Sequence, residues 1–162
     1  MIITCIDSCC LMNLLNSGFL IDLAASNQRE FYIQGLVEDE MQTQATQVQQ
    51  MISQRVLHLI SGGSILASEV DYIASKYNLG LGESECIAIG KKMNIAVASD
   101  DKRARTAANY ELGQSRVTGS IGLLREAVIA GNLRSSDAFQ AYRNMRASGA
   151  FLPRLASEFF QP

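Results

Sequence analysis

The sequence predicts an α/β fold in which helices flank a mainly parallel central sheet. Two short apolar runs, at residues 1–6 and 95–98, are each followed within two residues by an acidic residue. Between them lie segments whose apolar residues recur at helical spacing, and glycines separate several of these segments. Strands that alternate with helices along a chain are typical of a parallel sheet covered by helices.

The predicted elements follow one another in this alternating order. Strands are expected at 1–6, 31–33, 55–60, 95–98 and 115–118, with a break at Gly62-Gly63. Helices are expected around 11–15 and over 36–54, 67–77, 83–93, 103–110 and 123–130. Two further helices are expected after Ser135, separated near Ser148-Gly149.

Length and composition fit one globular domain. The chain has 162 residues, 48% of them hydrophobic, which is enough for one substantial core. Fourteen basic and sixteen acidic residues give a net charge of −2, which argues against a protein that binds polyanions by bulk charge. A local basic rim is still compatible with that balance.

The cysteines and the hydropathy pattern indicate the compartment. Cys5, Cys9, Cys10 and Cys86 have neither zinc-site spacing nor the pattern of a disulfide framework, so we expect reduced thiols. No run approaches the roughly 20 apolar residues of a membrane span. We therefore expect a soluble, cytoplasmic protein that does not enter a membrane.

Acidic residues follow both apolar runs, where such a fold would bring them together. Asp7 follows the first run, and Asp100 and Asp101 lie just after the run at 95–98. Ligands of open α/β sheets bind beyond the carboxyl ends of the strands, so we expect these acids to share one crevice. Carboxylates in one crevice repel one another, and a bound divalent cation relieves that repulsion at neutral pH. The pattern predicts a metal-dependent hydrolase.

Further acids lie on predicted helices. Glu40 follows Leu36 by four residues and Val37 by three, so it is expected on their face of the helix. Glu83 and Glu85 flank the apolar stripe of the next helix at similar angular offsets, and the spacing does not choose between them. Structural interpretations also exist, because an acid can cap a helix or interact with the dipole of its first turn.

The acidic segments resemble, in order, the motifs of the PIN domain, a small nuclease fold that includes toxins of the VapC type. The resemblance covers most of the chain and implies a three-layer α/β/α architecture with residues 135–162 as a C-terminal helical extension of a single domain, 1–162. This sequence has Cys86 where the third motif has Ala, and Ser99 and Ser120 where Thr is usual. The matching segments are Ile6-Asp7-Ser8, Val37-Glu38-Asp39-Glu40-Met41, Gly82 to Ile89, Ser99-Asp100-Asp101 and Val117 to Leu124.

The resemblance implies a ribonuclease that uses Mg²⁺ or Mn²⁺. Asp7 would be the principal metal ligand, with Glu85 and Asp101 completing the ligand set. Glu40 would help to position the metal or the attacking water. The catalytic set implied in this way is Asp7, Glu40, Glu85 and Asp101, with Asp100, Glu83, Ser8 and Ser99 as second candidates.

Substrate and partners are also implied by the resemblance. Arg103 and Arg105, just beyond the fourth motif, are expected to contact RNA phosphates. A toxin of this type would be neutralised by a cognate antitoxin protein, and a homodimer could form through the apolar helix at 121–130.

Two other functional classes stay open. A phosphatase of the haloacid dehalogenase type requires Asp-x-Asp after the first strand, whereas Asp7 is followed here by Ser8 and Cys9. A non-catalytic PIN-like module that binds RNA or protein would be expected to lack one or more of the acids, and none is missing from the motifs.

Overall fold

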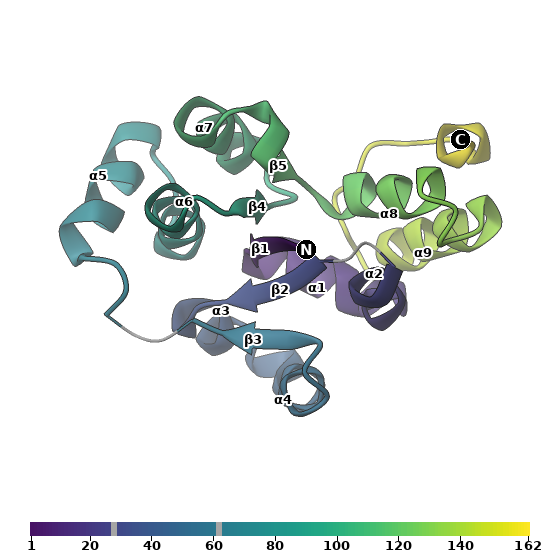
Figure 1. Cartoon of the computed structure of the whole chain (residues 1–162), viewed down its shortest axis with the longest axis horizontal. Helices are drawn as coiled ribbons and strands as arrows, with labels where there is room; N and C mark the ends of the chain where they lie inside the picture. The colour runs from purple at the N-terminus through teal and green to yellow at the C-terminus, as the bar shows by residue number, and fades with distance from the viewer. Residues whose placement is uncertain (27–28, 61–62) are drawn as a thin grey trace.

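The computed structural model describes residues 1–26, 29–60 and 63–162. Within these ranges, five strands form one parallel sheet in the order β3-β2-β1-β4-β5 (Figure 1). The strands are β1 (Ile2–Ile6), β2 (Arg29–Ile33), β3 (Leu57–Leu59), β4 (Ala96–Ala98) and β5 (Val117–Thr118).

Helices connect each strand to the next. The α-helices are α1 (Ser8–Ser17), α2 (Leu20–Ser26), α3 (Gly35–Glu40), α4 (Ala45–Ser53), α5 (Ala67–Tyr77), α6 (Leu81–Met93), α7 (Lys102–Leu112), α8 (Ser120–Ile129) and α9 (Ser135–Ala147). Short 3₁₀ turns follow at η1 (Gln42–Gln44), η2 (Gln114–Arg116) and η3 (Ser157–Phe160). None of the helices described is long and apolar enough to cross a bilayer.

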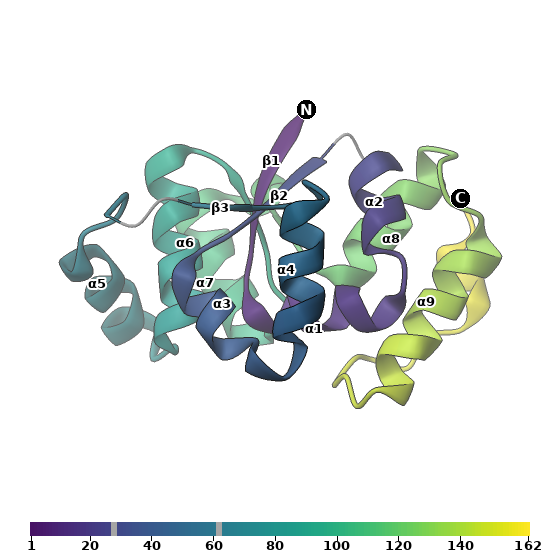
Figure 2. The same ribbon diagram turned by 90° about the horizontal axis from the view of Figure 1, so that it is seen from below.

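The sheet separates two layers of helices, which confirms the predicted three-layer α/β/α architecture. Successive residues of a strand point to opposite faces. Cys5 and Val97 therefore pack with α5, α6 and α7, whereas Ile6 and Ala98 pack with the helices of the other face. In both ribbon views α6 and α7 lie together on one side, and α8 and α9 lie together on the other (Figures 1 and 2).

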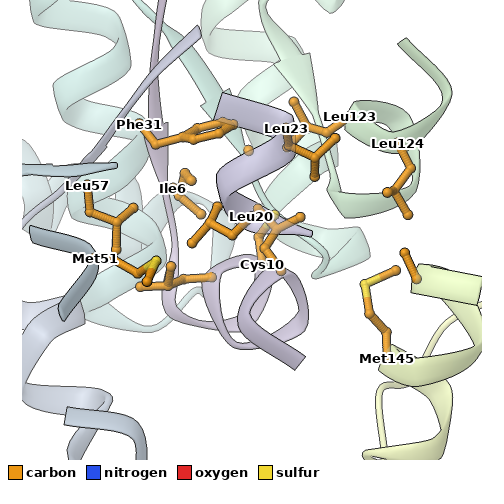
Figure 3. Close-up of a cluster of buried hydrophobic side chains, with 14 of the residues drawn as sticks. Ile6, Cys10, Leu20, Leu23, Phe31, Met51, Leu57, Leu123, Leu124 and Met145 are labelled. Atoms are coloured by element: carbon orange, nitrogen blue, oxygen red, sulfur yellow. The ribbon is translucent and has the colours of Figure 1, made fainter. Parts of the chain in front are cut away.

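The larger core fills the face that carries α1, α2, α8 and α9. Ile6 and Phe31 of the sheet meet Leu23 of α2 and Leu123 of α8 there, and all four side chains are fully buried (Figure 3). Burying each apolar side chain of this size contributes about 1.5–3 kcal/mol. This core joins the beginning of the chain to its end.

The C-terminal residues belong to the same core. Tyr142 of α9 and Phe160 of η3 are buried and pack ring to ring, with centroids 5.7 Å apart. These two aromatic side chains pack into the core, whereas Phe151 is fully exposed. The second helix expected after Ser135 is only the 3₁₀ turn η3, which follows an extended stretch.

Two other helical expectations need correction. The helix predicted over 36–54 is divided into α3, η1 and α4, because the chain turns at Met41, whose apolar side chain is buried. Helix α2 was not predicted at all, although Leu20, Leu23 and Ala24 have helical spacing. Of the break predicted at Gly62-Gly63, Gly62 lies outside the described residues, and Gly63 is in a turn with φ of 85°.

Close contact between α6 and the sheet depends on a glycine. A Cβ atom at Gly90 would lie 2.5 Å from Val97 Cγ2 and 3.0 Å from Leu112 Cδ1. Real side chains do not approach this closely, so only glycine allows α6 to pack at its present distance from β4 and α7. This packing holds the first turn of α6 beside the carboxyl ends of the central strands.

Candidate active site

The candidate site lies where the order of the strands reverses. β1 is at the centre of the sheet, with β2 and β3 on one side and β4 and β5 on the other. Ile6 pairs with Ala98, and the Asp7 amide donates to the Ala98 carbonyl at 3.1 Å. Ligands of open α/β sheets bind at such a switch point. Asp7, which follows β1, and Asp100, which comes soon after β4, lie there together.

Asp7 is buried at the beginning of α1. Its Oδ1 accepts a hydrogen bond of 2.8 Å from the Cys10 amide, so the residue is the N-cap of this helix. Only 1% of Asp7 is exposed, and no described residue makes a hydrogen bond of normal geometry with its Oδ2. The Ser99 hydroxyl is nevertheless close enough to the carboxyl group to lower its pKa. Asp7 therefore caps the helix through Oδ1, as the structural interpretation predicted. Capping does not account for the burial of Oδ2.

The surroundings of Asp7 disfavour its negative charge. Burial raises the pKa of Asp7 to about 7, and the Ser99 hydroxyl and the Cys10 amide only partly offset this effect. The charges of Asp100 and Glu83 raise the pKa further. A pKa shift of this size is typical of functional sites. Burial of an unpaired carboxyl group lowers the stability of the folded state, so it is found mainly where function requires it.

Asp100 is fixed by both neighbouring helices. Its Oδ2 accepts a hydrogen bond of 2.7 Å from Asn13 Nδ2 of α1, and its Oδ1 accepts one of 2.8 Å from the Ser120 amide of α8. Gly119 permits this arrangement, because a Cβ there would lie 2.7 Å from Asp100 Oδ1. Asp100, ranked second in the sequence, is thus the acid of its pair whose charge acts on Asp7.

Glu83 and Glu85 point to different parts of the surface. Glu83 Oε2 accepts a hydrogen bond of 2.7 Å from the Gly80 amide, and the Glu83 charge raises the pKa of Asp7. Glu85 lines a separate pocket, and burial raises its pKa. Glu83 therefore lies near Asp7, whereas Glu85, the acid that the resemblance assigns to the third motif, lines this second pocket. The assignment of the third site acid stays a prediction. The pocket of Glu85 is also lined by Gln34, Glu38 and Ile60.

Glu40 lies at the C-terminal end of α3 and contacts α6. Its carboxylate oxygens are 2.9 and 3.1 Å from where a Cβ of Gly82 would be, so Gly82 provides the space for this acid. Val37 is buried but Glu40 is exposed, which differs from the face that the spacing predicted. The side chain of Leu36, the other member of that comparison, lies outside the described part of the chain.

Asp101 caps the helix that follows β4. Its Oδ1 accepts a hydrogen bond of 2.7 Å from the Ala104 amide at the start of α7, and its own amide donates to Ser99 Oγ at 3.2 Å. Cys9 lies close to all of these acids. Partial burial, followed by the charges of Asp7, Asp100, Asp101 and Glu83, raises the pKa of the Cys9 thiol to about 12.

A groove of 1070 Å³ extends from Asp100 and Asp101 across the surface. Ser8 and Cys9 of α1, Asp100 and Asp101 line its acidic end. The groove is also lined by Lys102, Arg103 and Arg105 of α7, and by residues 148–153 after α9.

The two arginines predicted to contact RNA are partly engaged within the protein. Arg105 donates a hydrogen bond of 3.0 Å from Nη1 to the Ser99 carbonyl, and Arg103 donates to the Asn78 carbonyl. The Lys102 ammonium makes no hydrogen bond or ion pair with another described residue and is exposed. Lys102 directly follows Asp101 and lines the groove, although Arg103 and Arg105 were the preferred phosphate contacts in the sequence.

The acids fit a hydrated cation better than a closed metal cage. Across the described ranges, no three His, Cys, Asp or Glu side chains are near enough to one another to form a preassembled metal site. Mg²⁺, however, keeps several waters and is usually held through one or two carboxylates. The unpartnered Asp7 Oδ2, with Glu83 and Asp100 close enough to act on its charge, suits such an ion.

Comparison with known proteins decides the family. A family model, DUF3368, which is described as a PIN domain, matches residues 3–160. The chain belongs to the PIN-domain family. This PIN domain therefore has a nuclease-type fold. No curated protein and no solved structure matches the chain significantly.

Sequence reasoning missed the polar groups that hold the acids of this PIN domain. Asn13 is buried on α1 between the buried residues Leu11 and Leu14. An amide within an apolar stripe needs a hydrogen-bond partner, and that signal could have identified it. The Ser120 amide left no such signal, because a backbone donor does not depend on the residue type.

Proposed function

We propose that this protein is a divalent-metal-dependent endoribonuclease. The observation that carries the proposal is the unpartnered Asp7 Oδ2 at the switch point of the sheet. Glu83 and Asp100 act on the charge of Asp7, and a groove with basic residues begins there. A buried carboxylate oxygen without a hydrogen-bond partner, beside other acids, supports a cation site. The long groove supports a polymeric substrate.

Asp7 would hold the cation, with Glu83 and Asp100 contributing charge directly or through bound water. A bound Mg²⁺ or Mn²⁺ supplies an activated water and neutralises charge on the phosphate that is attacked. Asp7 releases its proton when it becomes a ligand, so cation binding is expected to strengthen as the pH rises. Asp100 stays in place during this change, because Asn13 and the Ser120 amide hold both of its oxygens.

The basic residues of the groove would bind the phosphates of the substrate. Lys102 is available for a direct contact, and Arg105 can add a second while its Nη1 remains bound to the Ser99 carbonyl. Contacts to phosphates position a nucleic acid without reading its sequence. The groove therefore supports binding of RNA in general and leaves the choice of target to other contacts.

We further propose that the nuclease is the toxin of a toxin–antitoxin pair. The resemblance of the acidic motifs to those of VapC-type toxins supports this role. Expression of the wild-type chain should then arrest bacterial growth, and expression of Asp7→Asn at the same level should not.

A homodimer through the helix at 121–130 stays a prediction. Most apolar side chains of α8 pack inside the monomer and so are not available to a second copy, whereas Ile129 is exposed. The buried residues are Leu123, Leu124, Ala127 and Val128.

A non-catalytic RNA-binding PIN domain is the second candidate. The observation that favours it is the absence, among the residues described, of three acids near enough to form a preassembled metal site. Such a protein would bind RNA through the same groove and would show no dependence on Mg²⁺. Cleavage separates the two functions.

The first test is cleavage of a panel of labelled RNAs by the purified protein with Mg²⁺, with Mn²⁺ and with EDTA. Asp7→Asn keeps the N-cap, because the asparagine oxygen can accept from the Cys10 amide, but it removes the charge that binds the cation. We expect cleavage to fall by at least about 100-fold, in line with the loss of a principal contact to the reacting group. Asp71→Asn, an exposed acid on α5, is the matched control and should cut at the wild-type rate.

The outcomes separate the candidates clearly. Cleavage that requires the cation and disappears in Asp7→Asn supports the nuclease. Cleavage that survives in Asp7→Asn contradicts the role given to this residue. RNA binding without any cleavage, unaffected by Mg²⁺, supports the non-catalytic domain instead.

A further inference from the structure

Phe151 is a fully exposed aromatic residue in the wall of the groove. Its relative exposure is 104%, whereas the aromatic residues Tyr142 and Phe160 of the same region are buried. A phenylalanine ring left in water loses the stabilisation that burial would provide. The groove that this ring lines also contains Asp100, Asp101 and Lys102.

The segment that carries Phe151 is held rigidly on both sides. Upstream, the Ala150 amide donates to the Met145 carbonyl at 3.1 Å, which ties the segment to the end of α9. Downstream, the Tyr142 hydroxyl donates to the Pro153 carbonyl at 2.7 Å and accepts from the Leu155 amide at 2.9 Å. The backbone that carries the ring is therefore fixed in advance, so a ligand loses little entropy in ordering this part of the wall.

The remaining lining of the groove decides what such a ring would contact. One side carries the cations Lys102, Arg103 and Arg105, and the acidic end carries Asp100 and Asp101. An apolar protein segment would leave these charges without partners. A single-stranded nucleic acid matches both features, because its phosphates pair with cations and its exposed bases stack on aromatic rings.

We infer that Phe151 is a stacking platform for one base of single-stranded RNA bound in this groove. The inference rests on the proposed function and adds to it a residue that positions the strand. Bases within a duplex are not free to stack on a side chain, so the role requires a single strand. Phe151 is a positioning residue: it holds the strand while the acids act on a phosphodiester bond.

The test measures binding of a short labelled single-stranded RNA without metal, in the Asp7→Asn background so that nothing is cut. Phe151→Ala should weaken binding by about tenfold or more, as expected for the loss of one stacked base. Phe151→Tyr should retain the affinity and Phe151→Leu should not, because leucine is apolar but has no ring. Tyr110→Ala removes an equally prominent exposed aromatic residue of α7 that does not line the groove, and should bind normally.

A scan of the RNA with single abasic sites then identifies stacking itself. At one position, loss of the base should weaken binding to the phenylalanine protein and should not weaken binding to Phe151→Ala any further. If Phe151→Leu binds as well as phenylalanine does, or if no abasic position removes the difference, stacking is refuted.

The inference and the proposed function can fail separately. Metal-dependent cleavage by the wild type, together with unchanged RNA binding by Phe151→Ala, would overturn the platform alone and would point to a protein partner for this wall. Binding that depends on Phe151 without cleavage by the wild type would overturn the nuclease alone. Absence of both binding and cleavage would overturn both.

Discussion

Asp7 combines a structural role with the proposed role in cation binding. One of its oxygens caps α1, and the other is buried without a partner next to the charges of Glu83 and Asp100. A cap alone would favour an exposed, ionised aspartate, because an ionised acceptor strengthens the hydrogen bond and interacts well with the helix dipole. The burial of Asp7 therefore serves the site and costs stability.

The pH dependence of stability should reveal this cost. The pKa of Asp7 is about 7 in the folded protein and 3.8 without its surroundings, so the folded state binds a proton that the unfolded state has lost. The contribution of Asp7 to the free energy of unfolding is fully present below pH 3.8. It is lost as the pH rises through 7. The upper limit of the loss is about 4 kcal/mol, at 1.36 kcal/mol per pKa unit.

Urea denaturation at pH 5 and pH 8 in EDTA measures the effect. Wild type should lose stability between these two values, and Asp7→Asn, which cannot ionise, should lose much less. Addition of Mg²⁺ at pH 8 should stabilise the wild type, because a cation bound only to the folded state favours it. Equal pH dependence in the two proteins would refute the raised pKa.

At the same scale, the sequence predicted which segments bring acids near the end of β1 better than it predicted the position of each acid. Asp7 was identified because an acid directly after an apolar strand has a defined place in a parallel sheet. Glu83 and Glu85 could not be separated, since both flank one apolar stripe and only the tertiary position of α6 decides which one faces β1 and β4. The same limit applies to Asp100 and Asp101, whose roles depend on Asn13 and on the first amides of two helices.

At the scale of elements, the position of α6 depends on the contact of Gly90 with β4 and α7. Gly90→Ala should destabilise the protein, because Val97 is β-branched, buried and unable to move aside. Overpacking of this kind costs about 1–3 kcal/mol, which exceeds the gain of about 1 kcal/mol in helix propensity. Cleavage should fall as well, since α6 carries Glu83.

Thermal denaturation of Gly90→Ala measures this cost. Gly35→Ala is its control, because a Cβ at Gly35, in the first turn of α3, would have no neighbour within 4 Å. That variant should be as stable as the wild type or slightly more stable. A stable, fully active Gly90→Ala would contradict the close packing of α6.

Long elements with clear helical spacing were predicted well, and short ones were not. The helix expected at 67–77 coincides with α5, because its apolar residues lie on one face and glycine follows within three residues. The region 36–54 has continuous helical character in sequence, but burial of Met41 between α3 and α4 breaks it. Local spacing contains no information about such a tertiary contact.

At the scale of the whole molecule, residues near the C-terminal end of the sequence pack into the same core as residues of β1 and α1. Phe160 is fully buried and packs against Tyr142, whereas its neighbour Phe159 is 37% exposed and lies over Arg125. Phe160→Ala should cost about 3–5 kcal/mol, as expected for a large buried side chain. Phe159→Ala should cost about 1 kcal/mol.

Urea denaturation of the two variants under identical conditions tests this difference. The pair is closely matched, because the residues are adjacent and of the same type. Equal losses would show that η3 contributes to stability as a whole and not through the buried ring. A small loss for Phe160→Ala would make residues 135–162 an appendage rather than part of the core.

The groove has one wall near the beginning of the chain, at Ser8 and Cys9, and another at residues 148–153. During translation, Ser8 and Cys9 of the first wall are synthesised before residues 148–153 of the second wall. A nascent chain therefore holds the acids of the site without the surface that would present RNA to them. The complete groove can exist only after residues 148–153 have been synthesised and have packed beside α9.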